Sequence, residues 1–226
     1  MPTSLYSMLI LLPPSEKKTI PSASGALNLS VLSFAEELGE ARAKAIADYN
    51  PEILNQSSAA AIDVYSGVLY QSLDWHSLTP SAQKRGQESL VIISALFGAL
   101  RPLDLIAVYK TPIRTSDWKE SVSKALGTLK TDLIIDCRSS TYSGVWTPPN
   151  EKLVEVRVFK EHNGERSVIT HMSKKYRGEL ARYLLLQKKS AKDFKSLHAL
   201  ISEKFLCEFI QGDSTNAAKL DLIIQL

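Results

Sequence analysis

The stretch Val91-Ile-Ile-Ser-Ala-Leu-Phe-Gly-Ala-Leu-Arg-Pro-Leu-Asp104 passes from an apolar run into a charged turn. Leu90 to Ile93 is apolar without alternation, which predicts a strand buried on both faces. Small residues and a glycine follow, and Arg101 to Asp104 closes the stretch with a Pro-fixed turn. In α/β proteins, a strand that ends in this way commonly builds a site at its carboxyl end. The alternative is a loop with a structural Arg–Asp pair, and the sequence leaves both readings open.

Two other apolar runs also predict buried strands. Met8 to Leu12 ends at a Pro-Pro pair, because proline cannot donate to a strand ladder. Asp132 to Cys137 contains the run Leu-Ile-Ile. Helical stripes lie between these strands, most clearly after Asp117 and Glu120, whose spacing is that of a capping box. The alternation of strands and helices indicates a mixed α/β or α+β domain.

The second half of the chain contains a hairpin pattern. Leu153 to Lys160 alternates between apolar and polar residues, and Asn163-Gly164 is a strong turn signal. The residues Arg166 to Met172 alternate again and predict the return strand. A helix is expected from about Ser173 to Lys189, and Leu220 to Leu226 is expected to be a final strand.

Composition places the chain among ordinary globular proteins. It has 226 residues, of which 44% are hydrophobic and 23% are charged. This length fits one domain over residues 1–226, with residues 1–7 as an extension or tail. No apolar run approaches the roughly 18 residues of a membrane helix, and the first residues lack the basic region of a signal peptide. We therefore expect a cytosolic protein.

The cysteines and histidines give no metal or cofactor signal. Cys137 and Cys207 stand alone, without a C-x-x-C pair, and the four histidines are scattered. Cys137 is a poor candidate nucleophile, because the neighbouring Asp136 carboxylate would raise the thiol pKa. Iron sequestration by protein ligands would need clustered His, Asp and Glu, which the sequence does not offer. We predict neither a metal nor a cofactor.

Positive charge is concentrated in the second part of the chain. The net charge is only +3, yet residues 174–195 hold eight Lys and Arg against Glu179 and Asp193. Lys174 and Lys175 are expected near a helix start, where free backbone N–H groups also attract phosphate oxygens. Such clustering is typical of a polyanion-binding surface. The alternative is a solvated helix face.

Polar residues follow each of the three predicted buried strands. Ser15-Glu16-Lys17 follows the first, Arg101 and Asp104 follow the second, and Asp136 and Arg138 lie at the end of the third. These clusters would converge if the strands were parallel neighbours, and together they could bind an anion or run acid/base chemistry. Each cluster taken alone could equally be a capped surface turn.

Five motifs occur in order and together resemble one family. They are Leu11-Leu-Pro-Pro-Ser-Glu-Lys17, Tyr65-Ser-Gly-Val-Leu-Tyr70, Ser94-Ala-Leu-Phe-Gly-Ala-Leu-Arg-Pro-Leu-Asp104 with Tyr109, Asp136-Cys-Arg-Ser-Ser-Thr-Tyr142, and Lys174-Lys-Tyr-Arg-Gly178 with Arg182. This set runs from about Met8 to Leu186 and resembles the peroxide stress protein YaaA family.

The resemblance implies a cytosolic bacterial protein of the hydrogen peroxide response, linked to limiting free iron and to DNA binding. It also implies a central mixed β-sheet wrapped by helices, with a basic cleft. Lys110 stands where the family pattern has arginine, which keeps the charge but loses the bidentate fork. Longer relatives have a segment that resembles a helix-hairpin-helix, and we expect residues 31–55 to be too short for that element.

Our working hypothesis is a non-enzymatic stress protein that binds double-stranded DNA or another polyanion through the basic cleft. The alternative is an enzyme acting on a small phosphorylated or carboxylated metabolite in the same cleft. The candidate binding residues are Ser15, Glu16, Lys17, Arg101, Asp104, Lys110, Asp136, Arg138, Lys174, Lys175, Arg177 and Arg182.

Overall fold

The computed structural model describes residues 8–22 and 27–225, apart from the side chains of Thr170 and His171. The extension predicted for residues 1–7 lies outside this description. Among the described residues, no helix is both long enough and apolar enough to cross a membrane.

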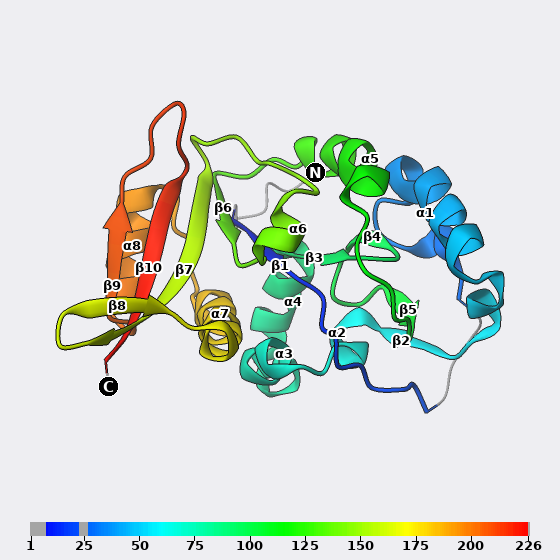
Figure 1. The fold of residues 1–226 in the computed structure, drawn as a ribbon, viewed down its shortest axis with the longest axis horizontal. Helices are drawn as coiled ribbons and strands as arrows, with labels where there is room; N and C mark the ends of the chain where they lie inside the picture. Colours follow the sequence, from blue (N-terminus) through cyan, green and yellow to red (C-terminus); the bar gives the residue numbers. More distant parts are fainter. Residues whose placement is uncertain (1–7, 23–26, 226) are drawn as a thin grey trace.

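The centre of the molecule is a mixed sheet of eight strands (Figure 1). Its order is β4-β3-β1-β6-β7-β10-β9, and β8 pairs with β7. The strands β3, β1, β6, β7 and β10 run parallel, while β4, β8 and β9 are antiparallel to their neighbours. The bounds are β1 Met8–Leu12, β3 Leu90–Ser94, β4 Gly98–Leu100, β6 Leu133–Asp136, β7 Leu153–His162, β8 Glu165–Val168, β9 Cys207–Ile210 and β10 Ala218–Gln225. A separate pair joins β2 Ser58–Ala60 to β5 Leu105–Ala107.

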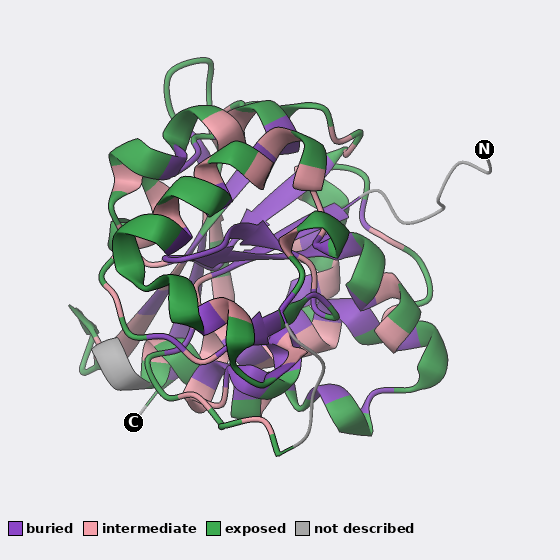
Figure 2. Ribbon diagram, turned by 90° about the vertical axis from the view of Figure 1, so that its right-hand side faces the viewer, coloured by how far each residue is buried: buried purple, intermediate pink, exposed green. Residues whose placement is uncertain are grey.

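Helices cover both faces of this sheet, because successive residues of each buried strand point to opposite sides. Ile10 and Leu12 of β1 belong to one apolar cluster with residues of α3, α4, α7 and α8, whereas Leu9 and Leu11 belong to a second with residues of α1 and α5. Figure 2 shows the buried strands between helices whose outer surfaces are exposed. The helices are α1 Ala35–Tyr49, α2 Ala61–Val64, α3 Val68–Leu73, α4 Pro80–Ser89, α5 Thr115–Gly127, α6 Ser140–Ser143, α7 Thr170–Leu186 and α8 Phe194–Ser202.

The expected fold class, a mixed sheet wrapped by helices, is confirmed, and two local expectations are wrong. The return strand predicted over residues 166–172 ends at Val168, and α7 begins at Thr170. Asp117 does not cap α5, because that helix begins at Thr115 with Arg114 as its N-cap and no side-chain cap.

A short strand that the sequence did not predict turns the chain back after β3. Gly98 adopts φ 69°, and a Cβ at this position would lie 2.7 Å from the Trp118 ring, so only glycine fits. The following residues form β4, which runs antiparallel to β3 and places Leu100 opposite Ile92. The turn after β4 therefore lies at the amino end of β3, away from the carboxyl ends of β1 and β6.

Candidate functional site

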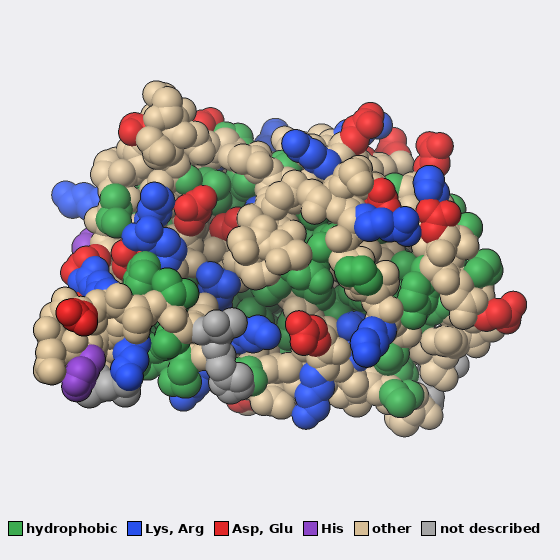
Figure 3. Space-filling model, viewed as in Figure 1, with side chains coloured by type: hydrophobic (Ala, Val, Ile, Leu, Met, Phe, Trp, Pro, Cys, Tyr) green, Lys and Arg blue, Asp and Glu red, His purple; other side chains and the backbone are tan. Residues whose placement is uncertain are grey.

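The site is built at the carboxyl ends of β3, β1, β6 and the adjoining part of β7, which we call the carboxyl edge. From β1 the chain crosses to β3 on one side, and it later returns to β6 on the other. The connections that follow these neighbouring strands leave in opposite directions, and ligands of open α/β sheets bind outside the carboxyl ends at such a point. In Figure 3, hydrophobic side chains show in the middle of the molecule, with Lys and Arg and also Asp and Glu side chains around them.

Three buried hydroxyl groups meet at the end of β3. The Ser94 Oγ lies 2.8 Å from the Tyr109 hydroxyl, which lies 2.9 Å from the Tyr65 hydroxyl. The backbone N–H groups of Leu96 and Phe97 donate to Ser94 Oγ and hold it in place. Burial raises the pKa of Tyr109 to about 12 and that of Tyr65 well above 10. Both phenols are therefore neutral at physiological pH.

Lys18 lies over the rings of Tyr109 and Tyr65. Its Nζ is 4.3 Å from the centre of the Tyr109 ring and 5.7 Å from that of Tyr65, at cation–π distance. The strand-like bridge between Lys18 and Tyr65 fixes this position. Burial lowers the pKa of Lys18, and the nearby Glu16 charge acts in the opposite direction. Among the described residues, its ammonium group has no hydrogen bond and no ion pair.

Two more tyrosines continue the site over β1. The Tyr70 hydroxyl donates to the carbonyl of Pro13 at 2.7 Å, and the Tyr70 and Tyr65 rings lie 5.3 Å apart. Tyr142 follows β6 and is partly buried, and burial together with the Glu16 charge raises its pKa. The Tyr65 and Tyr70 rings belong to the buried core, whereas Tyr142 leaves part of its side chain exposed.

Arg177 reaches the same edge from α7. Its Nη2 donates to the Val156 carbonyl at 3.0 Å, and its Nε is buried without a hydrogen-bond partner. Its charge favours the Cys137 thiolate, but burial dominates and raises the pKa of Cys137 to about 12. Gly178 lets α7, the helix that carries Arg177, pack closely against α3. A Cβ at this position would collide with the Leu69 carbonyl of α3.

Asp136 and Arg138 lie at this edge but bond to each other. The Arg138 guanidinium makes hydrogen bonds of 2.9 and 2.7 Å to the two Asp136 carboxylate oxygens. It also donates to the carbonyls of Trp146 and Tyr142, and both charged side chains are buried. This pair holds the loop after β6 in place and has little left to offer a ligand.

Arg101 and Asp104 are not brought to the carboxyl edge, contrary to the expected convergence. The reason is β4, which carries the chain back to the amino end of β3. There Arg101 donates to the carbonyls of Glu88 and Leu90 at 2.8 and 2.9 Å. The Asp104 carboxylate accepts from Ser33 and from the Arg101 backbone N–H. These residues form the structural turn that was the alternative interpretation of the sequence.

The other candidates divide into bonded and free groups. Arg182 donates to the carbonyls of Leu73 and Asp74 at the end of α3, and Lys175 pairs with Glu179 on α7. Ser15 is buried beside Gly67, where a Cβ would collide with its Oγ. The exposed candidates that form no ion pair with a described residue are Glu16, Lys17, Lys110 and Lys174.

Sequence reasoning missed the centre of the site, namely Lys18, Ser94 and the tyrosines. Tyr65, Tyr109 and Tyr142 all stand within or beside the shared motifs, but an aromatic residue on an apolar pattern resembles ordinary core. Recurrence of several tyrosines beside strand ends was the signal available. The described residues contain no group of three or more His, Cys, Asp or Glu side chains positioned to hold a metal.

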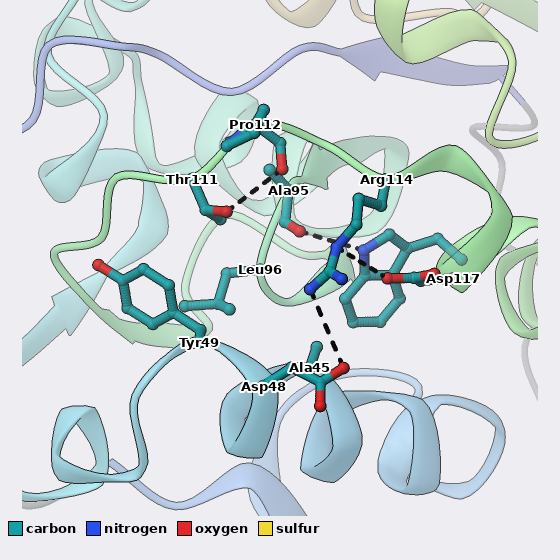
Figure 4. A pocket seen from close by; sticks show the side chains of 10 residues that line it. Ala45, Asp48, Tyr49, Ala95, Leu96, Thr111, Pro112, Arg114 and Asp117 are labelled. Atoms are coloured by element: carbon teal, nitrogen blue, oxygen red, sulfur yellow. Dashed lines mark hydrogen bonds and ion pairs between the residues drawn. The ribbon is translucent and has the colours of Figure 1, made fainter.

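A hollow of about 120 Å³ lies between α1, α5 and the segment before α5 (Figure 4). Arg114 lies across it, 3.2 Å from Asp117 and 3.9 Å from Asp48. The Trp118 indole donates to the Ala95 carbonyl at its inner wall. Its charges are paired within the protein, so this hollow offers an anion less than the carboxyl edge does.

Comparison with known proteins gives one consistent result. A family model described as peroxide stress protein YaaA matches residues 8–208. A UPF0246 protein of Streptomyces coelicolor is 31% identical over 217 residues, which cover 79% of this chain and 83% of the relative. A UPF0246 protein of Corynebacterium efficiens is 34% identical over 221 residues, covering 81% and 87%. A third, from Marinomonas, is 31% identical over 185 residues, covering 74% and 70%.

Proposed function

The chain belongs to the peroxide stress protein YaaA family, and on that premise we propose that it binds a polyanion, DNA foremost, through cations around its carboxyl edge. In this proposal the protein acts during hydrogen peroxide exposure. Its effect is to limit free iron and to protect DNA. The working site is the rim of the carboxyl edge, and not the buried arginines nearby.

The observation that carries this proposal is a set of exposed cations without acidic partners. Lys17 follows the end of β1, Lys110 follows Tyr109, and Lys174 lies one helical turn before Arg177 on α7. None of the three forms an ion pair with a described residue. Exposed, flexible ammonium groups suit phosphate oxygens, whereas base recognition requires donors and acceptors held in fixed positions.

Binding of this kind has a specific electrostatic signature. Each neutralised phosphate releases counterions, so the logarithm of affinity falls with the logarithm of salt concentration by about 0.9 per contact. We therefore expect duplex DNA binding with a steep salt dependence and little sequence preference. Glu16 at the same edge reduces the attraction, and Glu16→Gln should strengthen binding.

Fluorescence anisotropy with a labelled duplex at several salt concentrations tests the proposal. Lys17→Ala and Lys174→Ala should each weaken binding and reduce the salt slope by about one. The matched control is Lys124→Ala. Lys124 is an exposed lysine on α5, and this helix packs on the face of the sheet opposite to α7. Absence of binding at low salt, or an equal loss in the control, would overturn the proposal.

A further inference from the structure

The hollow between α1 and α5 carries its charged groups where solvent reaches them. Its volume is about 120 Å³, and its lining includes Asp48 from α1, Asp117 from α5 and Arg114 from the segment before α5. The side chains of these three residues are 37%, 34% and 59% exposed. A ligand can therefore contact each of them without any movement of the core.

Arg114 places one guanidinium group between two carboxylates (Figure 4). Its Nε lies 3.2 Å from Asp117, and its Nη2 lies 3.9 Å from Asp48. The first distance is at the long end for a hydrogen bond, and the second is beyond it. Exposed ion pairs of this kind stabilise a protein by at most about 1 kcal/mol. The arrangement shows that a guanidinium group fits between the two carboxylates and that the resident one is weakly held.

The charges that line the hollow favour a cation over an anion. Two carboxylates face a single guanidinium group. Lys44, which bonds to Asp48 at 2.6 Å, is 72% exposed and does not belong to the lining. An anion in the hollow would meet both carboxylates, whereas a cation gains both of them when the Arg114 side chain turns outward into solvent.

The other walls suit a short apolar stem. Tyr49 and Pro112 line the hollow away from Asp117, and both are exposed. The Lys110 backbone N–H donates to the Tyr49 hydroxyl at 3.2 Å and holds this wall to the segment before α5. A cavity of roughly 150 Å³ admits benzene, so a hollow of about 120 Å³ admits a stem of roughly four carbon atoms.

We propose that the hollow between α1 and α5 binds a small alkylguanidinium compound, whose charged group replaces the Arg114 guanidinium between Asp48 and Asp117. The planar guanidinium group donates in pairs to carboxylate oxygens, which the point charge of an ammonium group cannot do. A ligand that no backbone restrains can approach both carboxylates to about 2.7–2.9 Å. Its stem lies against Tyr49 and Pro112. This inference goes beyond the polyanion proposal and does not depend on DNA binding at the carboxyl edge.

Two probes of nearly the same shape test the requirement for charge. n-Butylguanidinium carries the cationic group on a four-carbon stem, and n-butylurea is its neutral counterpart. Binding is followed by NMR through the indole Nε1–H of Trp118, which donates to the Ala95 carbonyl at the wall of the hollow. We expect a saturable shift of this signal with butylguanidinium at millimolar concentration. Butylurea should bind at least tenfold more weakly, because its hydrogen bonds lack the charge on the donor.

Variants of opposite effect assign the contacts. Arg114→Ala removes the competing cation and should raise the affinity for butylguanidinium about tenfold. Asp117→Asn and Asp48→Asn should each lower it about tenfold. The matched control is Lys119→Ala, which removes a positive charge from an exposed position of α5 outside the hollow and should leave the affinity within twofold. All four positions are exposed, and thermal unfolding verifies that the variants remain folded.

Four results would overturn the guanidinium site. They are equal affinity for the two probes, no saturable shift of the Trp118 signal, weaker binding in Arg114→Ala, and a gain in Lys119→Ala as large as that in Arg114→Ala. None of these results involves duplex DNA. Failure of the guanidinium site therefore leaves the polyanion proposal standing, and absence of duplex binding leaves the guanidinium site standing.

Discussion

The turn after β4 and the carboxyl edge contain the same residue types but use them differently. In the turn, Arg101 donates to two backbone carbonyls, and burial lowers its pKa to about 10. At the carboxyl edge, Lys18 lies against tyrosine rings near the Glu16 charge and forms no hydrogen bond or ion pair with a described residue, and the Nε of Arg177 has no acceptor. In the first region the donors bond within the fold, whereas in the second the Lys18 ammonium group and the Arg177 Nε have no acceptor among the described residues. Counting charges in a sequence cannot separate these two roles.

Arg138 is the strongest test of this comparison, since it lies at the carboxyl edge but bonds as a structural arginine. Arg138→Ala leaves the buried Asp136 carboxylate without its partner, and we expect a loss of about 3–5 kcal/mol in the free energy of unfolding. Urea denaturation measures this loss. Lys18→Met, the matched variant of an unpaired cation, should change stability by less than about 0.5 kcal/mol. Similar losses in the two variants would break the comparison.

Arg101 tests the other region in the same way. Arg101→Ala removes two charge-assisted hydrogen bonds to carbonyls and should destabilise the protein by about 1.5–3 kcal/mol. Duplex affinity should remain that of the wild type, because Arg101 lies away from the carboxyl edge. A clear loss of DNA binding in a variant that remains folded would show that Arg101 belongs to the binding site.

Gly178 tests how Arg177 is brought to the edge. In Gly178→Ala, the new Cβ would collide with the Leu69 carbonyl and lie 2.9 Å from the Ser72 Cβ, which should destabilise the protein by about 1–3 kcal/mol. Gly39 on α1 is the control, since nothing lies within 4 Å of its Cβ position. Gly39→Ala should stabilise by about 0.5–1 kcal/mol. Equal effects at the two glycines would argue against close packing of α3 and α7.

Cys137 gives the smallest expected effect, and it appears as a dependence on pH. Burial raises the pKa of its thiol from 9.0 to about 12, so above pH 9 the unfolded chain loses a proton that the folded chain keeps. Stability therefore falls as pH rises, by about 1.4 kcal/mol at pH 10. Urea denaturation of the wild type and of Cys137→Ala at pH 8 and pH 10 isolates this contribution. Parallel losses in the two proteins would show that the thiol is not shielded.

The main strands could be predicted from the sequence because burial on both faces leaves an uninterrupted apolar run. Met8–Leu12, Leu90–Ser94 and Leu133–Asp136 are such runs, and all three are strands. The short strands β4 and β9 have no pattern long enough to recognise. Missing β4 had the larger consequence, because an antiparallel strand of three residues moves Arg101 and Asp104 to the other end of the sheet.

The site was only partly predictable for a related reason. The strands β1 and β6 that precede Ser15 and Arg138 are parallel neighbours, with Leu11 opposite Asp136, but the hydrogen bonds of such side chains depend on partners distant in sequence. The Arg138 guanidinium donates to Asp136 and to two backbone carbonyls. Lys18, which directly follows Lys17, instead lies against a tyrosine ring. Tyr109 and Tyr65 are separated by 44 positions, so no local pattern could show that their hydroxyls meet.

The central position of β1 sets the order in which the sheet can assemble during synthesis. Met8–Leu12 leaves the ribosome before both of its partners, because β3 begins only at Leu90 and β6 only at Leu133. At 5–20 residues per second, this entirely apolar segment lacks β3 for roughly 4–16 s and β6 for roughly 6–24 s. We expect nascent chains of this protein to require a chaperone during that interval, and a pulse of synthesis without one to yield aggregate before β6 is made.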